Sequence, residues 1–134
     1  MRILILFSLI ISLFACNKST NTPPSKEIMA AGQKHYTAHC KVCHQANGEG
    51  TSMMNPPLAN NKTVTGSPEK LTKIVLFGQS GPIKVNGKKF NGVMAPHSHL
   101  SDKQLSEILT YIRNSWGNEA SAITTEQVRK VRFK

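Results

Sequence analysis

The chain has 134 residues, a formal charge of +10 and 39% apolar residues. This length allows one domain with a single core, and the low apolar content predicts that a cofactor, a metal or disulfides supplement that core. The positive charge suits acidic protein surfaces or lipid head groups. Nucleic acid is disfavoured, because the lysines are dispersed and no basic helix interleaved with aromatic residues occurs.

The N-terminus has the pattern of an export signal. Arg2 is followed by an apolar run from Ile3 to Ala15, after which the composition turns abruptly polar. The run is well short of the roughly 20 residues that a membrane-spanning helix needs. Residues 1–15 are therefore predicted to be a signal peptide, and the rest of the chain is expected on the periplasmic side of a bacterial membrane.

Cys16 directly follows the apolar run. The run ends in Leu13-Phe14-Ala15-Cys16, which resembles the lipobox of bacterial lipoproteins, although Phe14 is bulkier than that pattern prefers. The three cysteines are an odd number, and an exported protein rarely leaves one thiol free. We therefore expect a lipid anchor at Cys16 and a flexible tether over residues 16–26. A plainly cleaved signal with an incidental Cys16 is the alternative.

Helical periodicity begins at Glu27 and predicts a helix over residues 27–44. Four residues at steps of four share one face of it: Ile28, Gly32, Tyr36 and Cys40. Residues 45–66 are rich in glycine, proline and asparagine and are expected to form a long loop. In a compact domain, such a loop indicates that it wraps around something.

Two further helices follow. Ser67 and Pro68 predict a capped helix that ends at Gly78. Between the helices, residues 79–96 are rich in turns, and Asn86-Gly87 is typical of a tight hairpin turn. A capping box at Ser101 opens an amphipathic helix that is expected to end at Gly117.

Residues 118–134 form a basic C-terminal extension with a weak helical pattern through Ile123, Val128 and Val131. Thr124 or Thr125 is expected to cap this helix. The fold predicted for the whole chain is all-α, with three to five helices and long loops, and residues 27–117 make up its folded domain.

The motif that carries chemistry is Cys40-Lys41-Val42-Cys43-His44, the Cys-x-x-Cys-His arrangement of covalent haem c attachment. Two thiols three residues apart lie about one helical turn apart and can add to the two vinyl groups of one porphyrin. The imidazole of the next residue then lies beneath the iron. We therefore expect one covalent haem c, held by Cys40 and Cys43 and ligated by His44.

Other uses of this motif have less support. A zinc site needs a fourth ligand, and the only candidates are the isolated histidines His35, His39, His97 and His99. A thioredoxin-like redox pair is disfavoured, because no βαβ pattern surrounds the motif.

From Glu27 to Gly117 the sequence resembles the class I c-type cytochromes. Gly32, Tyr36 and Cys40 are similar to the N-terminal helix of that family, in which the glycine allows close approach of the last helix, here at Ile108 and Tyr111. The resemblance implies a small cytochrome c fold wrapped around one haem. It also implies that Pro56 binds the axial imidazole of His44 through its carbonyl.

Asn91-Gly92-Val93-Met94-Ala95-Pro96 resembles the loop that supplies the sixth ligand in this family, although Ala95 departs from the usual Met-Pro pair. The resemblance makes Met94 the expected second axial ligand. Met53 and Met54 are alternatives, as are His97 and His99 through bis-histidine ligation, and Met94 could also be core filling.

With both axial positions filled, the implied function is one-electron transfer rather than catalysis. The segment from Tyr111 to Asn118 is similar to haem domains associated with bacterial dehydrogenases and copper nitrite reductases. The expected partner is a redox protein that is acidic at its docking site and meets a basic face with Lys84, Lys88 and Lys89. The alternative is a small haem enzyme of peroxidase or nitrite-reducing type, with a labile sixth ligand.

Overall fold

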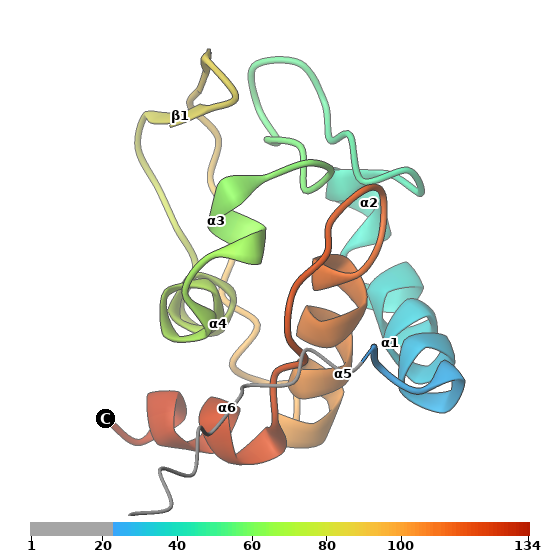
Figure 1. Cartoon of the computed structure of the whole chain (residues 1–134). Helices are drawn as coiled ribbons and strands as arrows, with labels where there is room; N and C mark the ends of the chain where they lie inside the picture. Colours follow the sequence, from blue (N-terminus) through green and yellow to red (C-terminus); the bar gives the residue numbers. More distant parts are fainter. Residues whose placement is uncertain (1–22) are drawn as a thin grey trace, which may run out of the picture.

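The computed structural model describes residues 23–134. The predicted signal peptide, Cys16 and the tether up to residue 22 lie outside this range. Within it, the regular structure consists of six helices and one two-stranded sheet (Figure 1). These elements are α1 (Lys26–His39), α2 (Lys41–His44), α3 (Lys62–Thr65), α4 (Pro68–Phe77), β1 (Ile83–Val85), β2 (Lys88–Phe90), α5 (Asp102–Arg113) and α6 (Thr125–Arg132).

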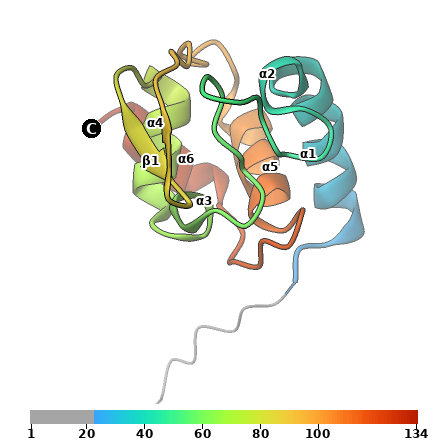
Figure 2. The same cartoon turned by 90° about the horizontal axis from the view of Figure 1, so that it is seen from above.

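Helices α1 and α5 lie side by side in both views (Figures 1 and 2). Gly32 of α1 is buried where the two helices meet. A Cβ atom at Gly32 would overlap the backbone carbonyl of Glu107 and lie 2.6 Å from Cβ of Tyr111. The close approach expected from the sequence is therefore present, with Glu107 rather than Ile108 as the second neighbour.

The helix predicted over residues 27–44 is interrupted at Cys40. This residue has φ −122° and ψ −31°, outside the helical range, so α1 ends at His39 and a separate turn, α2, begins at Lys41. Gln45 then ends α2 with a φ of 62°. The haem-attachment motif therefore occupies a turn of its own.

The predicted helix starts are confirmed by their caps. In each case a hydroxyl accepts a hydrogen bond from a backbone N–H three residues later, which satisfies a group that the helix itself leaves unpaired. The three caps are Ser67 for α4, Ser101 for α5 and Thr124 for α6, and the last two are full capping boxes.

Helix α5 ends at Arg113, four residues before the predicted end at Gly117. Two side chains compete for its last carbonyls: Asn114 Nδ2 donates to the Thr110 carbonyl at 2.9 Å, and Ser115 Oγ donates to the Tyr111 carbonyl at 2.7 Å. Such local bonds replace the helical ladder. The chain therefore leaves the helix early and turns at Trp116, where φ is 53°.

The hairpin predicted at Asn86-Gly87 is confirmed. Strands β1 and β2 pair antiparallel, and Asn86 and Gly87 have φ values of 49° and 81°, the left-handed conformation that a tight hairpin turn requires. A separate antiparallel bridge pairs Gln79 with Met94. Residues 79–94 therefore form one long loop that contains the hairpin, and the pairing of Gln79 with Met94 joins its two ends.

The C-terminal extension is part of the core. Helix α6 packs against α4 and α5. Its Val128 and Val131, and Ile123 just before the helix, join the main hydrophobic cluster. Within residues 23–134, no helix combines the length and the apolar character that crossing a membrane would need.

Candidate functional site

Cys40, Cys43 and His44 lie on one tight turn. The backbone N–H groups of Cys43 and His44 both donate to the Cys40 carbonyl, at 3.2 and 2.9 Å. Cys43 is exposed, and Cys40 packs against the hydrophobic core. Burial raises the pKa of the Cys40 thiol to about 11, and nearby Cys43 adds to the effect. One thiol therefore faces the apolar interior and the other lies at its edge.

His44 is buried, with 8% of its surface exposed. Its Nδ1 lies 3.3 Å from the carbonyl oxygen of Pro56. A carbonyl can only accept, so Nδ1 must carry the hydrogen, which leaves the lone pair of Nε2 free. Burial lowers the pKa of His44, the bond to Pro56 opposes this, and the charge of His97 lowers the pKa further. The side chain is thus a neutral, oriented imidazole, the form that binds a metal.

The loop that carries Pro56 is held by contacts far apart in the sequence. Gly48, at φ 67°, accepts a hydrogen bond from the N–H of Leu58 at 2.7 Å. Trp116 lies against Gly48, where a Cβ atom would come within 2.6 Å of the indole ring, and its Nε1 donates to the Ala46 carbonyl at 3.1 Å. Trp116 therefore positions the loop that orients His44.

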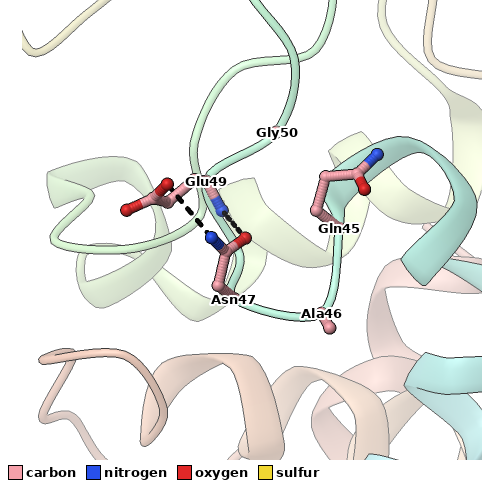
Figure 3. A pocket seen from close by; sticks show the side chains of 5 residues that line it. All are labelled: Gln45, Ala46, Asn47, Glu49 and Gly50. Atoms are coloured by element: carbon pink, nitrogen blue, oxygen red, sulfur yellow. Dashed lines mark hydrogen bonds between the residues drawn. The ribbon is translucent and has the colours of Figure 1, made fainter.

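A shallow hollow lies in the same loop, directly after His44 (Figure 3). Its lining consists of Gln45, Ala46, Asn47, Glu49 and Gly50. Asn47 Nδ2 donates to Glu49 Oε2 at 3.0 Å, and the N–H of Glu49 donates to Asn47 Oδ1 at 3.2 Å. These polar groups satisfy one another, and no side chain of the attachment motif lines the hollow.

Met94 is half-buried and packs against the hydrophobic core. Two backbone hydrogen bonds join it to Gln79: the N–H of Gln79 donates to the Met94 carbonyl at 3.0 Å, and the N–H of Met94 donates to the Gln79 carbonyl at 2.8 Å. Residues 77–80 and 93–96 together line a second hollow. Both backbone groups of Met94, its N–H and its carbonyl, are therefore held by Gln79.

The four other candidates for the sixth ligand differ in their surroundings. Met53 and Met54 are 74% and 64% exposed, and His99 is also exposed. His97 is half-buried, and its Nδ1 is a buried polar atom without a hydrogen-bond partner among residues 23–134. Burial therefore favours Met94 and His97 over the other three.

The histidines that are scattered along the sequence form a row in the structure. The ring centroids are 6.5 Å apart for His35 and His39, 5.9 Å for His39 and His99, and 5.7 Å for His99 and His97. In the described range of the chain, no three His, Cys, Asp or Glu side chains are placed to hold a metal ion by themselves.

Two buried side chains make hydrogen bonds that the sequence analysis did not predict. The hydroxyl of Tyr36 donates to the Gln45 carbonyl at 2.6 Å, at the end of the attachment turn. Arg113 is 2% exposed and donates to three carbonyls, those of Val64, Gly66 and Ser121, at 2.7 to 2.9 Å. A lone arginine on an amphipathic helix ordinarily faces solvent, so its pattern does not reveal this role.

The residues present fit a covalently attached haem. Two thiols lie on one turn, a neutral imidazole next to them keeps Nε2 free, and an apolar core adjoins Cys40. A porphyrin at this place also supplies the apolar surface that the composition lacks.

Comparisons with known proteins agree with this site. The family model described as Cytochrome c matches residues 29–116. Cytochrome c-552 of Thermus thermophilus is 37% identical over 114 residues, which cover 78% of this chain and 86% of that protein. The cytochrome c subunit of the alcohol dehydrogenase (quinone) of Gluconobacter oxydans is 32% identical over 104 residues. That match covers 76% of this chain and 22% of the subunit.

The fold agrees as well. The crystal structure of the c-type cytochrome XoxG from Methylobacterium extorquens AM1 matches with a TM-score of 0.50 and 19% identity, over 79% of this chain and 65% of that one. The predicted fold class is thereby confirmed, with six helices because two of them are single turns. The chain belongs to the cytochrome c family, carries one covalently bound haem c and serves electron transfer.

Proposed function

We propose that the protein is a one-electron carrier in the periplasmic or membrane-surface respiratory chain of a bacterium, with His44 and Met94 as the axial ligands of its haem iron. The bound haem supplies a metal that takes up and releases a single electron. Relatives that are cytochrome subunits of dehydrogenases support a redox protein as its partner.

The observation that carries this proposal is the position of Met94. Its side chain packs against the same hydrophobic core as Cys40 of the attachment turn. Its backbone N–H and carbonyl are both hydrogen-bonded to Gln79. Met53 and Met54, the other methionines considered as ligands, are exposed instead.

Each residue has a defined task in this function. Cys40 and Cys43 would bind the porphyrin covalently, Pro56 orients His44, and Met94 would supply the second iron ligand. If side chains supply both of these ligands, a small molecule would have to displace one of them before it could react. A thioether also raises the reduction potential above that of bis-histidine ligation, which suits a carrier.

The test is the substitution Met94→Ala in the oxidised holoprotein. The parent should show the weak near-infrared band of sulfur bound to ferric iron, and the variant should lose the band and have a lower potential. Met53→Ala is the matched control, because Met53 is exposed, and it should change neither property. A band that survives in Met94→Ala, or disappears in Met53→Ala, would contradict ligation by Met94.

We further propose that the hairpin of β1 and β2 docks the acidic partner. Lys84 and Lys89 lie directly opposite each other on the two strands, an arrangement of like charges that weakens a hairpin. In contrast to several basic residues of α4, α5 and α6, neither they nor Lys88 lies within ion-pair distance of an acid in residues 23–134. Their charge is therefore free to attract an anionic surface.

The proposed membrane attachment rests on the sequence, since Cys16 lies outside the described residues. The apolar run that ends at Ala15 is followed directly by this cysteine. One acyl chain gives only marginal binding, so stable anchoring requires two or more. Membrane-extracted protein should therefore begin at Cys16 with several acyl chains by intact mass, and Cys16→Ser should release the protein to the soluble fraction. An unmodified Cys16 would contradict the anchor.

A further inference from the structure

The segment that joins Met94 to α5 has no regular structure of its own and depends on contacts from elsewhere. At its start, Gln79 pairs with Met94 through two backbone bonds. In its middle, the N–H of His97 donates to the Val75 carbonyl of α4 at 2.9 Å. Its end is held by a side chain of α6.

That side chain is Arg132. Its Nη1 donates to the Ser98 carbonyl, its Nη2 to the Leu100 carbonyl and its Nε to Oδ1 of Asp102, each at 2.7 Å. A guanidinium offers these donors in one rigid plane, so a single side chain fixes two carbonyls of the segment and the first residue of α5. The side chains of Arg132 and Asp102 are 19% and 21% exposed, so solvent screens the pair only in part.

Arg132 lies beyond residues 29–116, the range that the family model matches. Helix α6 is nevertheless fixed to the domain, because Val128 and Val131 are buried in the common core. The backbone of Arg132 is therefore held in place by the core, and its guanidinium holds the carbonyls of Ser98 and Leu100.

We propose that Arg132 is a positioning residue that latches the segment behind Met94 and keeps the thioether on the iron. The inference rests on the proposed ligation by Met94. When the latch is weakened, the segment gains freedom at its α5 end, the thioether leaves its position more often, and an added ligand can take the vacated place. The C-terminal extension thereby determines how readily an added ligand replaces Met94 at the iron.

The experiment compares Arg132→Ala, Arg132→Lys and the matched control Arg129→Ala in the oxidised holoprotein. Arg129 lies on the same helix, is exposed and pairs only with Glu126 of that helix among the described residues. Imidazole is titrated as the competing ligand, and the near-infrared band reports the Met94 sulfur. Far-UV circular dichroism confirms that each variant is folded.

In Arg132→Ala we expect imidazole to bind about tenfold more tightly, since the apparent affinity rises in proportion to the open fraction. Tenfold corresponds to about 1.4 kcal/mol. Arg132→Lys keeps a charged donor group at this position. Its affinity for imidazole should lie between those of the parent and Arg132→Ala. Arg129→Ala should bind imidazole as the parent does.

Equal imidazole affinity in Arg132→Ala and the parent would overturn the latch, as would an equal gain in Arg129→Ala. If Arg132→Ala does not fold, Arg132→Lys decides by the same comparison. A parent without the sulfur band would contradict ligation by Met94 itself and remove the basis of the latch. If only the latch proposal is wrong, the parent shows the sulfur band and Arg132→Ala shows the same band and the same imidazole affinity.

Discussion

The crossing of α1 and α5 at Gly32 can be tested with one added methyl group. In Gly32→Ala the new Cβ would overlap the backbone carbonyl of Glu107 and lie 2.6 Å from Cβ of Tyr111. Both neighbours belong to α5, which packs against α1 and most of whose other side chains are buried. They cannot move aside as a flexible side chain would, so the two helices must separate.

The expected cost follows from two opposing effects. Overpacking a well-packed interior costs about 1–3 kcal/mol, and the upper value applies here because the obstacle is backbone. Alanine in a helix interior is about 1 kcal/mol more favourable than glycine. Gly32→Ala should therefore lower the free energy of unfolding by about 2 kcal/mol. For a domain near 100 residues this corresponds to a fall in Tm of about 8 °C.

The assay is guanidinium and thermal unfolding of the oxidised holoprotein, followed by circular dichroism. Ala30→Gly is the control, because Ala30 is exposed in the same helix and reports the glycine–alanine difference without a helix contact. It should cost about 1 kcal/mol. If Gly32→Ala were as stable as the parent, or more stable, the close approach at Gly32 would not limit the packing of the two helices.

Two more predictions concern the buried phenol and the basic hairpin. Burial raises the pKa of Tyr36, so above about pH 10 the unfolded chain loses this proton while the folded protein keeps it, and stability falls as the pH rises. Tyr36→Phe should cost about 1 kcal/mol at pH 7 and flatten this fall in guanidinium unfolding from pH 7 to 11; an unchanged slope would contradict the assignment. For the hairpin, Lys88→Glu with Lys89→Glu should slow electron transfer to an acidic partner at low salt, and the difference should fade as the Debye length shortens to about 10 Å at 0.1 M. The charge-matched control pair on α1, Lys26→Glu with Lys34→Glu, should have a smaller effect, and equal effects of both pairs would show that net charge alone matters.

Local chemistry let the sequence predict much of this protein. The attachment motif lies within five residues, so its spacing alone indicates a haem that is held by two thioethers and an imidazole. Helix caps act over three residues and hairpin turns over two, and for this reason Ser67, Ser101 and Asn86-Gly87 could be identified without any tertiary information.

Helix ends were less predictable where side chains compete with the backbone. The sequence favoured one continuous helix over residues 27–44 and another from Ser101 to Gly117. The structure breaks the first at Cys40, and it ends the second at Arg113 because Asn114 and Ser115 take over helix carbonyls.

The contacts that complete the site were decided only by the tertiary structure. Trp116 reaches the loop of His44 across 70 positions of sequence, and Arg132 reaches the Leu100 carbonyl across 32. Each of these residues has an ordinary local pattern, a core aromatic in one case and a basic helix end in the other. A hydrogen bond between distant segments depends on how helices pack, and packing is a property of the whole core that no short stretch of sequence specifies.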